Sequence, residues 1–207
     1  IFDLDGTLLD SMYLWDTIGE AYLVNRGITP EPGLNQKFKT MSIVQAAEYY
    51  RAVYGITDEI QSIIDGVNGM IDRFYRDSVK TKPGVLRLLE RFRTNGVKMC
   101  VATATDRYMV EAGLKRNGIL DYFCEIFTCT EVGFGKDSPV IYQKALQTLD
   151  TRQAETLVFE DAPYAVQTAK AAGFPVVGIY EEAFKTEQQQ VKEFCDYYLM
   201  SLEDWKD

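Results

Sequence analysis

The sequence predicts an α/β protein with a doubly wound, Rossmann-like parallel sheet and a helical domain inserted after the first strand. Three observations predict this class. Short, continuously apolar runs alternate with helical stretches in residues 84–207, as expected for parallel strands covered on both faces. Residues 12–79 carry almost no strand signal and have the pattern of helices throughout. Polar and charged residues stand at the ends of four apolar runs, where open α/β sheets bind their ligands.

The expected strands are short and continuously apolar rather than alternating, which favours parallel pairing. They lie at residues 1–3, 98–102, 156–159 and 176–180, with a weaker strand at 125–128 and an edge strand at 197–200. The sequence opens inside the first of these strands, and we therefore expect a few residues to precede Ile1 in the native chain.

Helical segments connect these strands. They are expected at residues 84–94, 107–116, 139–149 and 163–172. The first ends at Asn95-Gly96 and the last is closed by Gly173, both of which are common helix stops. Since each helix links two strands, right-handed βαβ crossovers and a doubly wound sheet follow.

Two domains are expected, and the helical one interrupts the other. The α/β core comprises residues 1–11 and 81–207, and the helical domain comprises residues 12–80. Helices inside the insert are expected at residues 13–25, 43–54 and 58–77, and the Pro-rich loop 29–33 separates the first two. The probable hinges of such an insert are its two connections, near Asp10-Ser11 and at residues 80–83.

Composition excludes several classes of function. The net charge of −9 argues against a nucleic-acid binder, which requires a basic surface. No apolar run approaches the roughly 20 residues of a membrane-spanning helix, and no secretory signal is visible, so we expect a cytoplasmic protein. The chain has no histidine, which excludes Ser-His-Asp catalysis and makes Cys/His zinc sites implausible. Its four cysteines are expected to be free thiols.

Asp3 and Asp5 stand in the segment DLDGTLLD at residues 3–10, at the carboxyl end of the first expected strand. Gly6 permits a sharp turn directly afterwards, and such a turn would bring Asp5 beside Asp3. One carboxylate could then attack phosphorus while the other manages a proton. A DxDG turn can also simply end a strand, so this segment alone leaves both interpretations open.

Two further strand ends carry a hydroxyl and a cation. The hydroxyl of Thr103 can hydrogen-bond a phosphoryl oxygen, whereas Thr105 and Asp106 are the better candidates for capping the next helix. Lys136 lies in the loop GFGKDSP at residues 133–139, whose spacing is not that of a Walker P-loop. This lysine can hold an anionic nucleophile and a phosphate together, or it can be a solvated loop residue.

Glu160 and Asp161 follow the strand at 156–159 and open the next helix. Capping is one explanation, because the helix dipole stabilises acids at a helix N-terminus. Beside Asp3 they would instead form an oxygen-rich site suited to Mg²⁺, and repulsion among the clustered acids makes a divalent cation almost necessary. Four strand ends on one edge of one sheet thus carry chemistry-bearing side chains, which is improbable as a coincidence.

On these residues, the chain resembles the haloacid dehalogenase superfamily over essentially its whole length. The segment DLDGT at residues 3–7 resembles the first family motif, Thr103 the second, Lys136 the third and Glu160-Asp161 the fourth. The helical insert resembles the cap of the subfamily that includes phosphoglycolate phosphatases and β-phosphoglucomutase. Such a cap would close over the site and exclude water until substrate is bound.

The resemblance implies a Mg²⁺-dependent phosphatase that acts on a small phosphate monoester, such as a sugar phosphate. Asp3 would be the nucleophile that forms an aspartyl-phosphate, and Asp5 would be the acid for the leaving group and then the base for water. The implied phosphoryl-binding residues are Thr103, Ala104 and Lys136. The implied magnesium ligands are Asp3, the backbone carbonyl of Asp5, Asp161 and, at or near the metal, Glu160. An aspartate at position 5 disfavours the dehalogenase branch, whose reaction needs no general acid there.

The main alternative is a phosphomutase of the β-phosphoglucomutase type. That branch carries a histidine near Trp15 and an arginine near Ile43, and this chain has neither, although it retains Lys39 in the same loop. A less favoured alternative is a non-catalytic protein that binds a phosphorylated ligand. Such a protein would be expected to lose the nucleophile or the lysine, and all four motifs are intact.

The cap is expected to select the substrate, which the sequence does not name. Trp15 and Lys39 are the leading candidates for substrate contacts, and the further candidates are Lys37, Met41 and Ser42. Each is also explained as a packed or solvated side chain. The expected partner is a small phosphorylated metabolite, with no nucleic acid and no membrane, and we expect a monomer.

Overall fold

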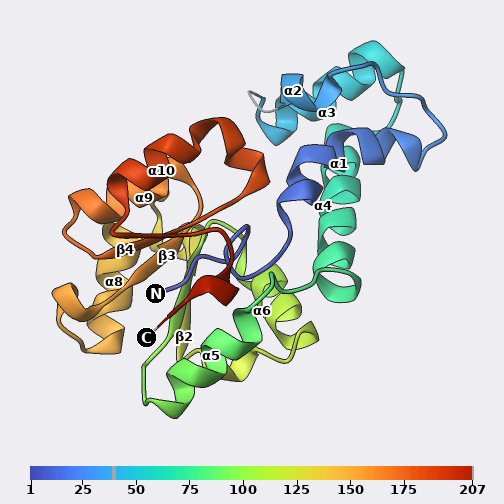
Figure 1. Ribbon diagram of the computed structural model, residues 1–207. Coiled ribbons are helices and arrows are strands. Elements are labelled where there is room, and N and C mark those ends of the chain that lie inside the picture. Colours follow the sequence, from blue (N-terminus) through green and yellow to red (C-terminus); the bar gives the residue numbers. More distant parts are fainter. Residues whose placement is uncertain (39–40, 207) are drawn as a thin grey trace. The chain divides into compact units, whose positions relative to one another are not determined.

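The computed structural model describes residues 1–38 and 41–206 (Figure 1). The chain divides into two compact units, Ile1–Ser11 with Val79–Asp207, and Met12–Ser78. The first unit is α/β, and the second is helical in its described part. The chain returns from the helical unit to the α/β unit between Ser78 and Val79, two residues before the boundary expected after residue 80. The reason is that the backbone N–H of Asp10 donates to the carbonyl of Lys80, which holds this segment to the α/β unit.

All strand pairs that the structure describes in the α/β unit are parallel. The strands are β1 (Cys100–Thr103), β2 (Glu125–Thr128), β3 (Val158–Glu160), β4 (Val176–Ile179) and β5 (Tyr197–Leu199). β2 pairs with β1, and β4 pairs with both β3 and β5. The expected first strand is reduced to Phe2, which bridges Val101 of β1 and Phe159 of β3. The resulting order, β2-β1-Phe2-β3-β4-β5, is the Rossmann order, with its switch point between Phe2 and β3.

Helices cover both faces of this sheet. One face carries α8 (Val140–Leu149), α9 (Pro163–Ala171) and α10 (Gln188–Phe194), which share a core with Ile1 and Val158. On the other face, α5 (Val85–Thr94) places Phe92 beside the stacked rings of Phe2 and Phe159, whose centroids are 4.4 Å apart. Neighbouring residues of one strand therefore enter different cores, which explains the continuously apolar runs.

The remaining helices of the α/β unit are α6 (Arg107–Arg116), α7 (Cys129–Val132) and the 3₁₀ turns Leu120–Tyr122, Gln153–Glu155, Glu182–Glu187 and Leu202–Asp204. α6 has 10 residues and buries Met109, Val110 and Leu114, whereas the others are short. Apart from the first strand, the predicted elements agree with the structure to within two residues at their ends. The helices α2, α7 and α10 were not predicted, because they have five, four and seven residues and are too short to show a helical period.

The helical unit contains α1 (Met12–Val24), α2 (Leu34–Phe38), α3 (Ile43–Tyr54) and α4 (Ile60–Asp77). Its core is rich in aromatic residues: the rings of Tyr22 and Tyr50 lie 5.1 Å apart, and both side chains are buried. The hydroxyl of Tyr50 donates to the carbonyl of Gly19 at 2.7 Å. A methyl group on Gly19 would overlap the ring of Phe38, so α1 and α2 approach closely only because residue 19 is glycine.

Two expectations from composition concern cysteines and membranes. The four cysteines are free thiols, as predicted. Among the described residues, none of the helices combines the length and apolar character needed to cross a membrane.

Gly84 provides a test of the packing at the start of α5. It has a φ of +85°, and a methyl group there would overlap the backbone of Leu202 and Glu203. We expect Gly84→Ala to lower the free energy of unfolding by about 2–4 kcal/mol, the sum of left-handed backbone strain and overpacking. The matched control is Gly96→Ala, at φ +71° with open space around it, which should cost only about 1–2 kcal/mol. If chemical denaturation gave the same loss of unfolding free energy for Gly84→Ala and Gly96→Ala, this account of the packing would be contradicted.

Candidate active site

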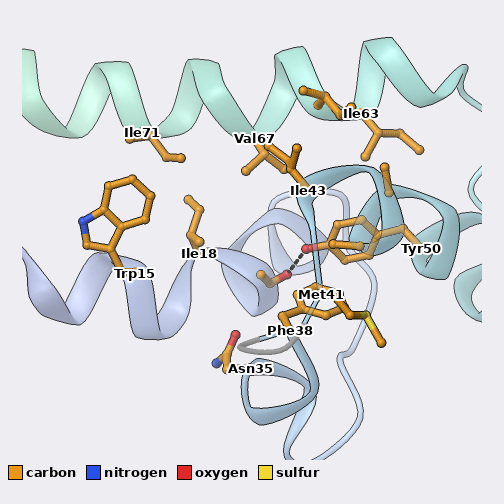
Figure 2. A pocket seen from close by; sticks show the side chains of 14 residues that line it. Trp15, Ile18, Asn35, Phe38, Met41, Ile43, Tyr50, Ile63, Val67 and Ile71 are labelled. Carbon is orange, nitrogen blue, oxygen red and sulfur yellow. Dashed lines mark hydrogen bonds between the residues drawn. The ribbon is translucent and has the colours of Figure 1, made fainter. Parts of the chain in front are cut away.

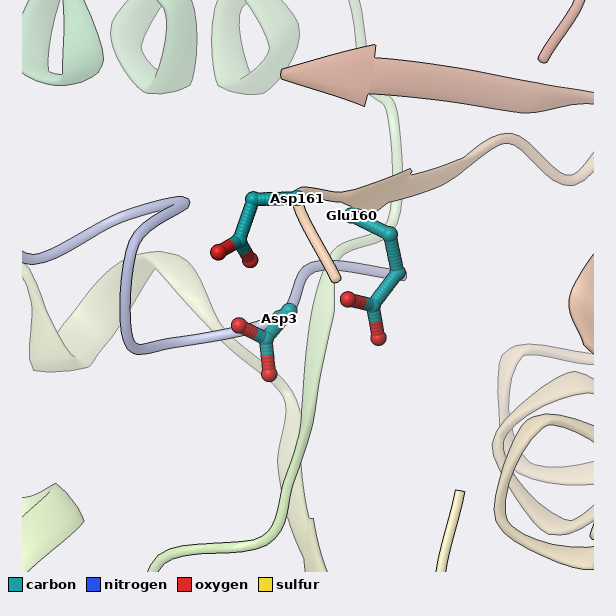
Figure 3. Close-up of side chains that lie close together, drawn as sticks. All are labelled: Asp3, Glu160 and Asp161. Atoms are coloured by element: carbon teal, nitrogen blue, oxygen red, sulfur yellow. The ribbon is translucent and has the colours of Figure 1, made fainter. Parts of the chain in front are cut away.

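Three acidic side chains meet at the switch point of the sheet. Asp3 directly follows Phe2, and its backbone N–H donates to the carbonyl of Phe159 at 2.9 Å. Glu160 ends β3 and Asp161 follows it. Carboxylate oxygens of Asp3, Glu160 and Asp161 lie within 4.8 Å of one another, and all three residues are buried. Figure 3 shows the three side chains lying close together.

Gly6 makes the predicted turn, with a φ of +85°. After this turn, two hydroxyls hold the Asp5 carboxylate. Ser11 donates to Oδ1 of Asp5 at 2.5 Å, and Thr105 donates to Oδ2 at 2.6 Å. The expectation that Thr105 caps a helix is therefore wrong. Asp106 is at the N-cap of α6 but makes no side-chain capping bond, since its carboxylate accepts from Thr130 at 2.8 Å.

Lys136 is buried, with 5% of its surface exposed, so the interpretation as a solvated loop lysine is wrong. α7 ends at Gly133, which has a φ of +82°, and the loop that follows turns Lys136 into the protein. Its Nζ donates to Oδ1 of Asp3 and, at 2.5 Å, to Oε1 of Glu160. The structure thus places the predicted lysine on the predicted nucleophile.

The side chains of Glu160 and Asp161 do not cap α9. That helix begins at Pro163 with Ala162 as its N-cap, so the capping explanation is wrong. The carboxylate of Glu160 instead accepts a hydrogen bond from the hydroxyl of Tyr142 at 2.8 Å. Oδ1 of Asp161 accepts from the hydroxyl of Thr7 at 3.1 Å.

Thr103 lies at the carboxyl end of β1 and is buried. Its Oγ1 accepts from the backbone N–H of Thr105 at 3.1 Å, so the hydroxyl proton can be donated to another acceptor. The neighbouring Ala104 is exposed. A hydroxyl donor and an exposed loop therefore end the strand adjacent to Phe2.

Comparison with known proteins shows which family has this sequence pattern. Residues 1–179 match the family described as haloacid dehalogenase-like hydrolase. The chain belongs to this family. Among its relatives, (DL)-glycerol-3-phosphatase 1 of Arabidopsis thaliana is 28% identical, covering 100% of this chain and 70% of that protein. A phosphorylated carbohydrates phosphatase of Thermotoga maritima is 26% identical over 84% of this chain and 80% of its own length.

A solved structure supports the fold of the hydrolase. It is described as a putative β-phosphoglucomutase from Thermotoga maritima, with a TM-score of 0.84 and 23% identity, and the match covers 98% of this chain and 94% of that one. At this identity the likeness establishes the fold alone. The predicted α/β core with a helical cap is thereby confirmed.

The acidic residues of the hydrolase fit a divalent cation. Oε2 of Glu160 and Oδ2 of Asp161 are buried and have no hydrogen-bond partner in the described part of the chain. In both side chains the other oxygen is held by the protein, so one oxygen of each remains for a ligand. Buried carboxylate oxygens without donors are costly unless a cation binds them, and oxygen donors are those that Mg²⁺ prefers.

The pKa values of Asp3, Asp161 and Lys136 are those of ionisable groups buried together with an excess of carboxylates. Burial raises the pKa of Asp3 to about 6, although the ammonium of Lys136 opposes this. Burial and the charges of Asp3 and Glu160 hold the pKa of Asp161 well above its usual range. Burial alone would lower the pKa of Lys136, but the same two carboxylates outweigh it and raise that pKa. Lys136 therefore stays charged, and without a cation the acids resist ionisation.

Lys82 is a further residue that the sequence analysis missed. Its Nζ donates to the carbonyls of Gly6 and Tyr180, at 2.7 and 3.0 Å, and to Oε2 of Glu181 at 2.6 Å. It thus ties the Gly6 turn to the loop after β4. The other missed contributors are Thr7, Ser11, Thr105 and Tyr142. Of these four residues, Tyr142 is the one with a visible signal in the sequence. It lies on the apolar face of the helix after the lysine loop, and a buried hydroxyl requires a hydrogen-bond partner.

The predicted substrate contacts of the helical unit have mixed outcomes. Trp15 is 40% exposed and lines an apolar pocket of about 240 Å³ to which α1, α2, α3 and α4 contribute residues (Figure 2). Lys39 lies outside the described residues. Lys37 donates to Oε1 of Glu31 at 2.6 Å, and Ser42 caps α3 by accepting from the backbone N–H of Gln45. These bonds give Lys37 and Ser42 structural explanations.

Neutralising Asp161 tests the cation site through stability. Because the folded-state pKa of Asp161 is raised, ionisation destabilises the native protein as the pH rises above the unfolded-state pKa. In EDTA, Asp161→Asn should therefore raise the Tm at pH 8, with a smaller gain near pH 4. Mg²⁺ at a hundredfold its Kd should stabilise the wild type by about 2.7 kcal/mol and leave the variant unchanged. The control is Asp121→Asn, at an exposed position, which Mg²⁺ should stabilise as it does the wild type. Equal stabilisation of the wild type and Asp161→Asn by Mg²⁺ would contradict the assignment of Asp161 to the cation site.

Thr105→Val tests the hydroxyl that holds Asp5. The change removes the donor to Oδ2 of Asp5 and nearly conserves shape, so a catalytic step that needs Asp5 in this position should slow while substrate binding is kept. We expect kcat to fall by about tenfold with little change in KM, the loss of one hydrogen bond to a charged group. The control is Thr94→Val, whose hydroxyl donates to a backbone carbonyl on the surface of α5. Equal kcat values for the Thr105 variant and the wild type would contradict the positioning of Asp5.

Proposed function

We propose that this hydrolase is a Mg²⁺-dependent phosphatase of small phosphate monoesters that works through an aspartyl-phosphate on Asp3. The observation that supports it best is the pairing of Asp3 with Lys136 beside two buried carboxylate oxygens that lack donors. The lysine keeps the nucleophile ionised and oriented. The two open oxygens provide the place for the cation that an anionic substrate requires.

In the first half-reaction, a carboxylate oxygen of Asp3 attacks phosphorus in line with the leaving group. Thr103 and Lys136 hold the phosphoryl oxygens by donating hydrogen bonds, with the exposed Ala104 segment beside them. Asp5, in its protonated form, gives its proton to the departing alkoxide oxygen. The products are an alcohol and a phosphorylated Asp3.

In the second half-reaction, the carboxylate of Asp5 takes a proton from water, and the water oxygen attacks the phosphorus of the acyl phosphate. The bond between phosphorus and the Asp3 oxygen breaks, which releases inorganic phosphate and restores both acids. Ser11 and Thr105 suit both states of Asp5, because a hydroxyl can donate to a carboxylate or accept from a carboxylic acid.

The proposed cation ligands are carboxylate oxygens of Asp3, Glu160 and Asp161, with the backbone carbonyl of Asp5. A divalent cation bound there supplies positive charge that polarises the phosphoryl group. The hydroxyl of Thr7 fixes Asp161 for this role by holding its Oδ1.

The proposed substrate class is the phosphorylated sugars and polyols. The relatives support it, since their names describe phosphatases of glycerol 3-phosphate and of phosphorylated carbohydrates. Trp15 and Lys39 are proposed as residues of the helical unit that contact the leaving group. The acidic balance of the chain agrees with small metabolites rather than nucleic acids as partners.

The decisive assay distinguishes hydrolysis from phosphoryl transfer between sugars. With a hexose bisphosphate and a panel of sugar and polyol phosphates, we expect release of inorganic phosphate in the presence of Mg²⁺ and no interconversion of sugar phosphate isomers. Asp3→Asn, purified in the same way, is the control for contaminating activity. Isomer interconversion without phosphate release would establish a mutase. Binding without either reaction would establish a non-catalytic protein.

A further inference from the structure

The hydroxyl of Tyr142 reaches the active site from the helix that follows the lysine loop. Tyr142 lies in the first turn of α8 and is fully buried beside Phe174, with ring centroids 6.1 Å apart. Its Oη donates to Oε1 of Glu160 at 2.8 Å. Nζ of Lys136 donates to the same oxygen at 2.5 Å. Two donors from one short stretch of chain therefore converge on one carboxylate oxygen.

This convergence decides how Glu160 presents its two oxygens. The terminal torsion of a glutamate is soft, so its carboxylate rotates unless both ends are constrained. Here the two donors fix Oε1 on the side of Lys136 and leave Oε2 as the buried oxygen without a partner in the described residues. A partial rotation would move Oε1 away from Nζ of Lys136 and remove the acceptor that Lys136 uses while it contacts Asp3.

Packing alone does not explain a tyrosine at this position. The other inward residues of α8 are apolar, and phenylalanine would fill the same volume without burying a hydroxyl. A buried hydroxyl is kept at low cost when it bonds a charged acceptor, which is what Glu160 provides.

We propose that Tyr142 is a positioning residue that fixes Oε1 of Glu160 beneath Lys136, so that Lys136 stays on Asp3 and Oε2 of Glu160 faces the cation. The catalytic part of this inference rests on the proposed phosphatase function. Tyr142 touches no reacting atom and acts through Glu160 and Lys136.

The test is Tyr142→Phe, which removes only the hydroxyl. We expect kcat for p-nitrophenyl phosphate to fall by about tenfold with KM within about twofold of the wild type, since one bond to a charged group is lost. The matched control is Tyr122→Phe. Its hydroxyl donates to Oε2 of Glu90 at 2.7 Å on the surface of the α/β unit, so kcat should be unchanged.

A second readout does not depend on catalysis. In ¹⁵N-lysine-labelled full-length protein without metal, the ammonium of buried Lys136 should give a slowly exchanging NH₃⁺ signal, assigned by its absence in Lys136→Met. Tyr142→Phe should shift or broaden this signal, and Tyr122→Phe should leave it in place. If the wild type hydrolyses no phosphate monoester, the phosphatase proposal fails while this measurement still decides the role of Tyr142.

Three results would overturn the inference. In the first, Tyr142→Phe keeps both the wild-type kcat and the wild-type NH₃⁺ signal. In the second, the hydroxyl contributes to folding only, and the variant has a lower Tm with an unchanged kcat. In the third, kcat falls while the Lys136 signal is unchanged, so that Tyr142 acts by a route other than Lys136.

Discussion

The ammonium group of Lys136 is buried between the carboxylates of Asp3 and Glu160, and the rest of the site depends on this arrangement. Burying a charge is costly unless it is paired, so the lysine and its two acids stabilise one another only in this geometry. With Asp161 included, three acids share one buried cation. The remaining negative charge is what a divalent cation would neutralise. Burial, reinforced by the neighbouring carboxylates, raises the pKa values of Asp3 and Asp161.

The sheet supplies the positions that this ion cluster requires. Phe2 and β3 are neighbours in the Rossmann order, so Asp3 and Glu160 emerge side by side although they are far apart in sequence. After the Gly6 turn, Ser11 and Thr105 hold the carboxylate of Asp5, and Lys82 ties that turn to the loop after β4. The carboxylates of Asp3 and Asp5 are thereby held by different partners, as their proposed roles of nucleophile and proton-transfer group require.

Local patterns in the sequence were sufficient to predict the parallel sheet, the helical insert and the strand ends that carry Asp3 and Asp161. The prediction that Lys136 ends a strand was wrong, because α7 separates its loop from β2. Local patterns could not supply side-chain pairings that depend on how distant segments meet. Thr105 bonds a residue 100 positions away, and Tyr142 bonds one 18 positions away, so neither pairing has a local signature. The first strand was overestimated because its apolar residues are those of a strand, whereas only Phe2 forms bridges to both neighbours.

The central claim is that Asp3 receives the phosphoryl group from the substrate. It is tested most directly by reducing the enzyme with borohydride during turnover of a sugar phosphate with Mg²⁺, because borohydride converts an aspartyl-phosphate to homoserine. Mass spectrometry of the N-terminal peptide should then find homoserine at position 3, only when substrate is present and never in Asp3→Asn. Phosphate release without homoserine at position 3, or with the modification at another acid, would contradict the account.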